Sequence, residues 1–275
     1  MQSHNIKNPI ARLVIKLTIF CSVLFLLFRT EIDRWRQMRM PLPELREGKT
    51  ILEDDFESGD LADFWMEGDR GEGRYEAGAM VITNTFVHAG ESALQITVRE
   101  GDIPQIGSDG LENERAEMDS GKHPYLGTQK CYRFAFLVPQ DFPVVDVRLV
   151  ISQIKQRGKR GGPIVAQRFV NDTHTVVVDD DVAGFKRRYD LPAIEREVWH
   201  EMEYSIGYST GDDGFIQILM NGKEVVRYQG PTAIANNQNE FYHKFGLYRD
   251  RMKEPMTIYF DDFKISELEI VKPTE

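Results

Sequence analysis

Short runs in which apolar and polar residues alternate dominate the chain from Ile51 onward. A period of two residues places successive side chains on opposite faces of a β-strand, so each run predicts a strand with one buried face. Asn221-Gly222 lies between two of these runs and is typical of a hairpin turn. Helical periodicity is almost absent after residue 50. The pattern therefore predicts an all-β jelly roll, an antiparallel β-sandwich whose strands include residues 80–83, 93–98, 132–138, 148–155, 175–178, 199–206, 215–220, 224–228 and 256–265.

The first thirty residues follow a different pattern. Lys7, Arg12 and Lys16 precede an uncharged, mostly apolar run of twelve residues, Leu17–Phe28. Positive charge followed by a short apolar run is the pattern of an export signal. We expect one N-terminal hydrophobic helix over residues 1–30 that acts as an uncleaved signal anchor, with a cleaved signal peptide as the alternative. The rest of the chain would then be membrane-anchored and face the periplasm or cell exterior, or be secreted.

A polar stretch separates this segment from the predicted sandwich. Residues 31–49 end with Pro41 and Pro43 and predict a juxtamembrane linker. Residues 50–275 are long enough to bury one sizeable core, which predicts a single domain.

Charge is distributed unevenly between these regions. The whole chain has a formal charge of −10, yet residues 1–49 hold nine Lys or Arg and four Asp or Glu, so the remainder carries about −15. An acidic domain of this kind excludes a general nucleic-acid binder. Of the two cysteines, Cys21 lies in the apolar run and Cys131 in the domain, so no disulfide can form within the domain.

One predicted strand, residues 241–250, has an unusual polar face. Its apolar side chains share the opposite face, interrupted by His243 and Arg249. Two phenols that flank an ammonium suggest a surface that holds a ligand, with a glycine leaving room for it, and the alternative is an ordinary exposed face. The polar face carries, in order, Tyr242, Lys244, Gly246, Tyr248 and Asp250.

Two further strands combine an apolar face with a specific polar one. Asn113, Arg115 and Glu117 share a face of residues 112–119, and Gln153 with Lys155 shares a face of residues 149–156. Side by side in a curved sheet, the three strands would line a groove with cationic, amide and phenolic groups.

This set of groups suits β-elimination on a uronic acid. The hydrogen at C5 is weakly acidic, and an arginine or amide that neutralises the adjacent carboxylate stabilises the negative charge that develops. A base must remove that proton, and an acid must protonate the departing O4. A tyrosine can do either where nearby cations favour its ionised form, and Lys244 is close to both phenols on the strand.

The same residues resemble a known family. The three signature strands of the jelly-roll (concanavalin-like) polysaccharide lyases are similar to Arg115-Ala-Glu117, Gln153-Ile-Lys155 and Tyr242-His-Lys244-Phe-Gly246-Leu-Tyr248. In alginate lyases these motifs read R-x-E-x-R, Q-I-H and Y-F-K-x-G-x-Y. The span from Asp54-Asp-Phe-Glu to Phe260-Asp-Asp-Phe most resembles the heparin lyase I and glucuronan lyase group.

The resemblance implies a role for each matching residue. Tyr248 would be the catalytic acid and a candidate base, supported by Lys244. Arg115 and Gln153 would bind the substrate carboxylate, and Asn113, Glu117 and Tyr242 would also contact the substrate, an anionic polysaccharide.

Two positions depart from the family pattern. Asp119 stands where the second arginine of R-x-E-x-R would be, and Lys155 stands where Q-I-H has its histidine. A desolvated lysine among cations can act as a base, so Lys155 joins the catalytic candidates. The other hypotheses are that Tyr248 performs both proton transfers, or that His123 or His174 takes the place of the missing histidine.

Basic residues gather between positions 148 and 168, a stretch without any acid. Local positive charge of this kind could attract a polyanion to an otherwise acidic domain, and a solvated hairpin tip is the alternative. The substrate-binding candidates in this stretch are Arg157, Lys159, Arg160 and Arg168.

Two other functions fit parts of the sequence. Glu114 and Glu117 resemble the carboxylate strand of laminarinase-like glycoside hydrolases, but they point to opposite faces of a regular strand. A non-catalytic carbohydrate-binding sandwich is the closer alternative, because Lys155 replaces the histidine.

Cofactor chemistry has little support in the sequence. Acidic residues near the first and last strands could hold a structural Ca²⁺, with Asp55 and Asp262 as ligands. No Cys/His cluster suggests zinc, and no glycine-rich strand-to-helix junction suggests a nucleotide. We expect a monomer that needs no redox cofactor.

Overall fold

The computed structural model describes residues 42–65, 75–102, 113–158, 162–179 and 187–271. All of these except Leu42 belong to one compact unit, Pro43–Glu275. Residues 1–41, with the predicted N-terminal hydrophobic helix, lie outside the described residues. Within those that are described, no helix is long and apolar enough to cross a membrane.

The described part of the chain forms fourteen β-strands and no helix. They are β1 (Leu45–Asp54), β2 (Met80–Thr83), β3 (Ala93–Val98), β4 (Asn113–Asp119), β5 (Gln129–Leu137), β6 (Leu149–Gln156), β7 (Val165–Val170), β8 (Thr173–Val178), β9 (Arg187–Asp190), β10 (His200–Gly207), β11 (Phe215–Met220), β12 (Lys223–Gln229), β13 (Phe241–Asp250) and β14 (Met256–Ile270).

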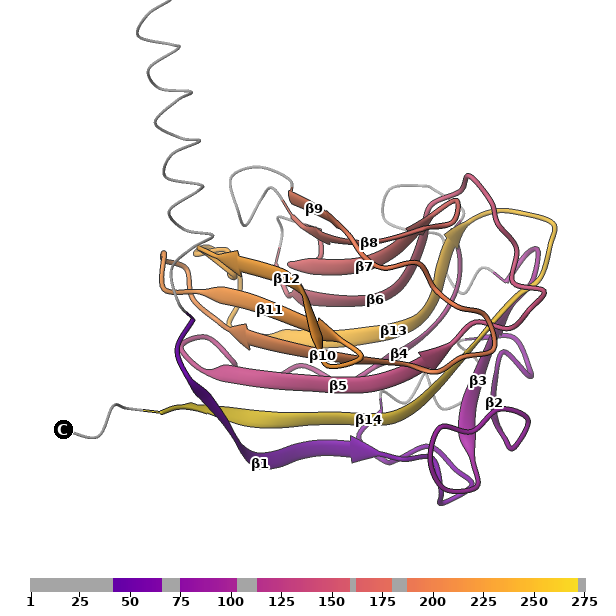
Figure 1. Ribbon diagram of the computed structural model, residues 1–275, viewed down its shortest axis with the longest axis horizontal. Helices are drawn as coiled ribbons and strands as arrows, with labels where there is room; N and C mark the ends of the chain where they lie inside the picture. The colour runs from indigo at the N-terminus through magenta and orange to yellow at the C-terminus, as the bar shows by residue number, and fades with distance from the viewer. Residues whose placement is uncertain (1–41, 66–74, 103–112, 159–161, 180–186, 272–275) are drawn as a thin grey trace, which may run out of the picture. The chain divides into compact units, whose positions relative to one another are not determined.

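The strands form two antiparallel sheets (Figure 1). An eight-stranded sheet has the order β12-β11-β10-β5-β14-β3-β2, with β1 also paired to β14. A six-stranded sheet has the order β4-β13-β6-β7-β8-β9. The all-β sandwich predicted from the alternating pattern is confirmed for the described residues.

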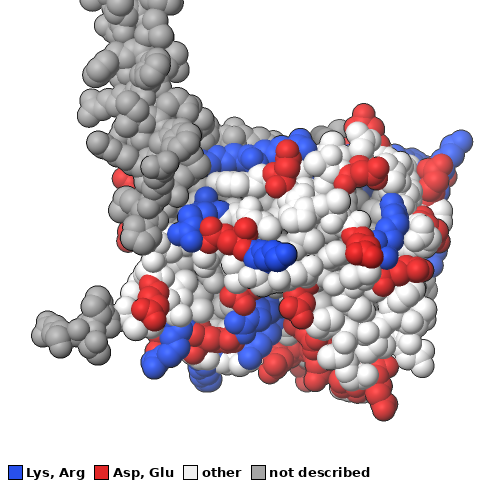
Figure 2. Space-filling view, in the orientation of Figure 1, with Lys and Arg blue, Asp and Glu red and all other residues white. Residues whose placement is uncertain are grey.

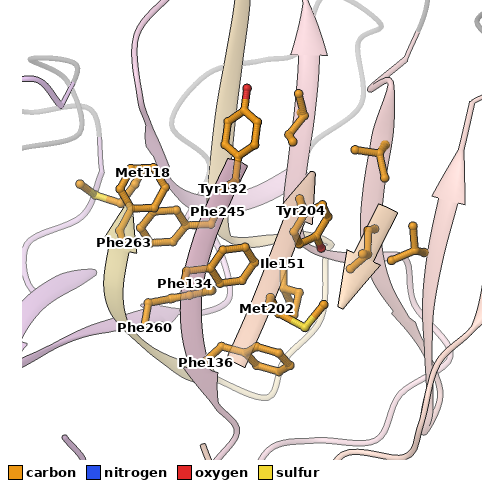
Figure 3. Close-up of a cluster of buried hydrophobic side chains, with 14 of the residues drawn as sticks. Met118, Tyr132, Phe134, Phe136, Ile151, Met202, Tyr204, Phe245, Phe260 and Phe263 are labelled. Atoms are coloured by element: carbon orange, nitrogen blue, oxygen red, sulfur yellow. The ribbon is translucent and has the colours of Figure 1, made fainter. Parts of the chain in front are cut away.

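The core lies between the two sheets. Figure 3 shows Met118 and Phe245 of the six-stranded sheet packed with Phe134, Phe260 and Phe263 of the other. The ring centroid of Phe245 lies 4.6 Å from that of Phe260 and 5.2 Å from that of Phe263. Burying one such aromatic side chain contributes roughly 1.5–3 kcal/mol, so this cluster fixes the apolar face of β13 against the opposite sheet. The polar face of β13 must then point away from the core.

Three strand segments were not predicted from the sequence. β1 includes residues 45–49, which the sequence placed in the linker, because its pairing with β14 is supported by polar contacts such as the Arg46–Glu269 ion pair. β7 and β9 also appear, and β7 contains Arg168, which the sequence predicted to be a substrate-binding candidate without placing it on a strand. The polar residues of β1 and β9 give a weak alternating signal, because cross-strand pairing rather than apolar burial holds them. β7 is mostly buried, but its sequence, Val165-Ala-Gln-Arg-Phe-Val170, does not alternate strictly between apolar and polar residues.

Candidate active site

Three neighbouring strands bring the predicted site residues to one face of the six-stranded sheet. β13 lies between β4 and β6 in the sheet order. Tyr248 pairs with Arg115 across β13 and β4, and Lys244 pairs with Gln153 across β13 and β6. The prediction that these strands lie side by side is confirmed. We call the surface they share the polar face, and it consists of Asn113, Arg115, Glu117 and Asp119 of β4, Tyr242, Lys244 and Tyr248 of β13, Gln153 and Lys155 of β6, Arg168 of β7, and Arg148 just before β6.

Tyr248 contacts two guanidinium groups. The guanidinium carbon of Arg115 lies 4.2 Å from the centroid of the Tyr248 ring, and that of Arg148 lies 4.8 Å from it. Arg148 is held in place by Asp250, at 2.8 Å, and by the side-chain oxygen of Asn113, at 2.5 Å. Asn113 therefore positions Arg148. Each cation–π contact contributes about 0.5–2 kcal/mol and orients the phenol within a positively charged setting.

Glu117 positions the amide of Gln153. The Gln153 Nε2 donates a hydrogen bond to Glu117 Oε1 over 2.5 Å, and both side chains are buried. An amide nitrogen carries two N–H groups, so the second remains for a ligand. The other carboxylate oxygen of Glu117 is buried and accepts no hydrogen bond from the described residues. Glu117 would therefore affect a bound ligand by orienting the amide of Gln153.

Lys244 is paired with Asp119, one of the two residues that depart from the family motifs. Its Nζ lies 3.5 Å from Asp119 Oδ2, and the two side chains are 10% and 7% exposed. Asp119 also accepts a hydrogen bond from the backbone N–H of Gly121. The carboxylate of Asp119, which stands where the family has an arginine, therefore holds the ammonium of Lys244 on the strand position opposite Gln153.

Lys155 and Tyr242 pair at the far end of the polar face. Burial and the nearby ammonium of Lys244 lower the pKa of Lys155. A lowered pKa gives a lysine a larger neutral fraction, which is the form that can accept a proton. Burial, with the carboxylates of Asp119 and Glu117, raises the pKa of Tyr242 to about 12. Tyr242 is therefore a hydrogen-bond donor at neutral pH.

Three cations on the polar face have no carboxylate partner. Arg115, Lys155 and Arg168 make no ion pair within 4.0 Å in the part of the chain that the structure describes. In the view of Figure 2, acidic and basic side chains are interspersed over the described surface. Unpaired cations on one face of an acidic protein favour an anionic ligand at that face.

The two histidines proposed to replace the missing catalytic histidine, His174 and His123, lie in different surroundings. His174 lies on the core side of β8, 1% exposed, where Gln167 donates a hydrogen bond to it over 2.8 Å. Burial, with the nearby His200, lowers the pKa of His174 to about 3, so the prediction that it could reach the site is wrong. His123 contacts the carbonyl oxygen of Ser120 through Nε2 and stacks on Tyr125. A role for His123 remains a prediction.

The two residues that interrupt the apolar face of β13 are both buried in the core. His243 contacts Ser152 Oγ through Nε2 over 2.8 Å, and burial lowers its pKa to about 3. Arg249 forms an ion pair with Glu114 at 2.8 Å, with both side chains 0% exposed. Glu114 is therefore unavailable as a catalytic carboxylate, and its position on the face opposite Glu117 is confirmed.

A glycine is required at position 246 for a different reason from the predicted one, which was to leave room for a ligand. A Cβ at this position would lie 2.2 Å from the carbonyl oxygen of Ala116, and the φ angle is +138°. The glycine is needed because β4 approaches β13 closely, in a conformation that other residues rarely adopt. It does not make room for a ligand.

Sequence reasoning counted Arg148 only among the basic residues between positions 148 and 168 and did not place it beside Tyr248, because β6 is irregular. Alternation back from Lys155 and Gln153 would put Ile151 on the polar face, but Ile151 lies in the core cluster (Figure 3). A register shift between Val150 and Ser152 moves Val150 opposite Tyr248. A β-bulge of this kind exchanges the two faces of the strand beyond it. No pattern in the sequence signals this shift.

The remaining basic candidates lie in different places. Arg157 follows β6 and forms an ion pair with Glu240 at 2.8 Å. Lys159 and Arg160 fall outside the described residues. Arg168 lies in β7, opposite Val150 of β6 and therefore on the polar face.

The metal candidates lie at the other sheet. Asp55 and Asp262 line a pocket of about 350 Å³ formed by β1, β5, β10, β11 and β14. Asp262 Oδ2 contacts His88 Nδ1 at 2.6 Å, and Asp55 accepts a hydrogen bond from the backbone N–H of Glu57. Over the described ranges, no group of three or more His, Cys, Asp or Glu residues is placed to hold a metal ion. A structural Ca²⁺ held by Asp55 and Asp262 remains a prediction.

Comparisons with known proteins bear on the family and the fold. The polysaccharide lyase family model matches residues 56–264. Among curated proteins, none matches the sequence. The structure is similar to an endo-β-1,4-glucuronan lyase from the fungus Trichoderma reesei, with a TM-score of 0.60, 16% identity, and coverage of 80% of this chain and 96% of that one. It is also similar to the family 7 alginate lyase A1-II′, with a TM-score of 0.50, 14% identity, and coverage of 72% and 85%.

At these identities the structural likeness shows the fold, and the matched region includes all three strands of the polar face. The family match spans well over half of the sequence. Assignment to the heparin lyase I group in particular remains a prediction. The chain belongs to the polysaccharide lyase family.

Proposed function

We propose that this lyase cleaves a polysaccharide containing uronic acid by β-elimination at the polar face. The observation that carries the proposal is the set of groups on β4, β13 and β6, where Arg115 pairs with Tyr248 and where Gln153, Lys155 and Lys244 share the same face. Unpaired cations bind carboxylates, and a phenol beside them can transfer a proton.

The carboxylate of the reacting uronate is bound by Arg115 and by the free N–H of Gln153. Neutralising this carboxylate makes the C5 hydrogen more acidic, because the charge that develops on the carboxylate in the transition state is stabilised. Glu117 keeps the Gln153 amide oriented, so little reorganisation is needed when the charge develops.

Tyr248 donates a proton to the departing O4. Arg115 and Arg148, which contact its ring, stabilise the phenolate left behind. The C5 proton goes to Lys155 or to Tyr248 itself. We favour Lys155 because it occupies the position of the family histidine, has no carboxylate partner among the described residues, and has a lowered pKa.

The substrate and location also belong to the proposal. A polymer of 4-linked glucuronate is the first candidate, and alginate, hyaluronan and heparin are others. The apolar segment near the N-terminus supports an enzyme that is anchored in a membrane or exported, acting outside the cytoplasm on such a polymer.

One observation favours a second candidate function. Lys155 and Asp119 depart from the catalytic motifs, so the polar face could hold an anionic polymer without cleaving it. The full-length chain, purified in mild detergent, is incubated with each polymer while the ultraviolet absorbance of an unsaturated uronate is followed. A rise with a uronate polymer supports elimination. Binding without a rise for any polymer contradicts it and favours the carbohydrate-binding function.

A further inference from the structure

Two lysines are neighbours on the polar face. Lys244 of β13 lies opposite Gln153 of β6, and Lys155 lies two residues further along β6, opposite Tyr242. The two lysines are therefore diagonal neighbours, about 7–8 Å apart at the backbone, a distance that long side chains can span. Two ammonium groups placed in this way repel each other, so the charge on one makes it easier for the other to lose its proton.

Only one of the two lysines has a countercharge. The Nζ atom of Lys244 lies 3.5 Å from Asp119 Oδ2, and the two side chains are 10% and 7% exposed. Asp119 is itself held by the backbone N–H of Gly121, at 3.1 Å. Lys155 is partly buried and forms no ion pair within 4.0 Å in the described part of the chain. The geometry therefore favours the charged form of Lys244 and the neutral form of Lys155.

The other groups around Lys155 do not reverse this preference. Tyr242, which lies opposite on β13, is a neutral phenol near pH 7, because its pKa is raised to about 12. Arg157, two residues further along the chain, is paired with Glu240 at 2.8 Å. On the far side of β6, the one charged residue of β7 is Arg168, at the opposite end of the strand. The remaining charged groups that face Lys155 are Lys244 of β13 and Arg115, Glu117 and Asp119 of β4.

The balance of these charges agrees with the geometry. Burial, and after it the ammonium of Lys244, lowers the pKa of Lys155 against the weaker attraction of the carboxylates of Glu117 and Asp119. Glu117 also accepts a hydrogen bond from Gln153, which spreads its charge toward that amide. Lys244 is therefore the largest electrostatic influence on Lys155.

We propose that Lys244 is a positioning residue for the proton acceptor of the elimination: Asp119 holds its ammonium in place, and this fixed positive charge makes Lys155 the member of the pair that works as a neutral amine. The inference rests on the proposed function, since it takes Lys155 as the base. It assigns to Lys244 an effect on Lys155, on the neighbouring strand, in addition to any effect on Tyr248.

The proton transfers balance over one catalytic cycle. The neutral amine of Lys155 takes the C5 proton and becomes an ammonium. The electron pair of the C5–H bond forms the double bond between C4 and C5, the bond from C4 to O4 breaks, and Tyr248 gives its proton to O4. Lys155 then releases its proton to water and Tyr248 takes one back. Repulsion from Lys244 favours the release, so the same charge restores the base for the next turnover.

The first measurement is the pH dependence of kcat/KM for the full-length chain in mild detergent, on a uronate polymer that wild type cleaves. Lys244→Gln removes the charge and keeps an N–H donor for Asp119, whereas Lys244→Arg keeps the charge. Lys223→Gln is the control, because Lys223 is exposed on β12 of the other sheet. Thermal unfolding of each variant establishes that it is folded.

Without the charge of Lys244, Lys155 should hold its proton to higher pH. We expect the rising limb of the profile to move to higher pH in Lys244→Gln, so that kcat/KM falls about threefold to tenfold more below the limb than on the plateau above it. Lys244→Arg should restore the limb, and Lys223→Gln should not move it. An unmoved limb in Lys244→Gln, or an equal movement in Lys244→Arg, would overturn the inference.

A double variant keeps the test decisive where Lys244→Gln does not fold. Asp119→Asn/Lys244→Gln leaves no unpaired charge in the site. Its limb should move in the same direction by a smaller amount, because Asp119 acts on Lys155 more weakly than Lys244 does. A limb that stays in place or moves to lower pH in the double variant would contradict the inference.

The second measurement needs no turnover and separates this inference from the proposed function. The chain is labelled with carbon-13 at the lysine Cε atoms, and the NMR signal of Lys155, identified by its absence in Lys155→Arg, is followed as the pH is changed. If wild type eliminates no polymer while the titration midpoint of Lys155 moves to higher pH in Lys244→Gln, the lyase reaction is wrong and the effect of Lys244 on Lys155 stands. If a polymer is eliminated and the midpoint does not move, the reaction stands and the inference is wrong.

Discussion

The buried ion pair between Glu114 and Arg249 should hold β4 and β13 of the site together. Arg249 donates hydrogen bonds to Glu114 Oε2 from Nη2 at 2.8 Å and from Nε at 2.9 Å, with both side chains 0% exposed. The other Glu114 oxygen accepts the backbone N–H of Gly101 at 2.7 Å, and Arg249 Nη1 donates to the carbonyl oxygen of Glu254 at 2.7 Å. Every strong contact of the pair is therefore made inside the protein.

Replacing Arg249 with Met leaves the carboxylate of Glu114 buried without its countercharge. Removing one partner of a buried pair typically costs about 3–5 kcal/mol, and we expect a loss in that range in the free energy of unfolding. For a domain with a total stability of about 5–15 kcal/mol, this is a large fraction. The double variant Glu114→Leu/Arg249→Met should lose less than the single variant, because no unpaired charge remains.

Urea unfolding, analysed by linear extrapolation, measures both values. Arg188→Met is the matched control, because Arg188 makes an ion pair of 2.9 Å with Asp190 at the surface, with side-chain exposures of 48% and 69%. A surface pair contributes about 0–1 kcal/mol, so the control should change little. A loss below about 1 kcal/mol in Arg249→Met, or a double variant less stable than the single one, would refute the reasoning.

Three further predictions address the proton acceptor, the strand contact and pH. In Lys155→His, the rising limb of the pH–rate profile should move to lower pH, since histidine loses its proton near pH 6.5; an unmoved limb would exclude Lys155 as the base. Gly246→Ala should lower the free energy of unfolding by about 2 kcal/mol or more, because its Cβ would collide with Ala116, and a neutral effect in urea unfolding would contradict this. Burial raises the pKa of Asp261 to about 6, so its stabilising contribution is complete below about pH 4 and is lost as pH rises through 6. The Asp261→Asn variant should therefore show a smaller fall in stability between pH 4.5 and 7.5 than wild type, and an equal fall would show that another group is responsible.

β6 and β13 could be predicted from the sequence because each has one largely apolar side, whereas Glu114 makes the core side of β4 only partly apolar. Alternation put Tyr248 and Lys244 on one face of β13, and packing of Phe245 in the core holds them there. The pairing of Tyr248 with Arg115 depends on the order of strands that are distant in the sequence, and only the family motifs suggested it.

Other parts of the site could not be predicted, because they depend on local irregularities and on long-range contacts. The bulge in β6 brings Arg148 beside Tyr248, and alternation alone does not show it. His174 seemed available from the sequence, but its strand turns that side chain into the core. The role of Gly246 depends on how closely β4 approaches, which only the three-dimensional structure shows.

The most direct test of the account is the turnover of a uronate polymer by wild-type protein and by Tyr248→Phe. Tyr259→Phe, in the eight-stranded sheet, is the control. Loss of a positioned acid or base typically lowers the rate by about 10²–10⁴, so Tyr248→Phe should lower kcat at least about a hundredfold while the Kd for the polymer stays within a few-fold. A kcat for Tyr248→Phe close to that of wild type would contradict the claim that this polar face performs the elimination.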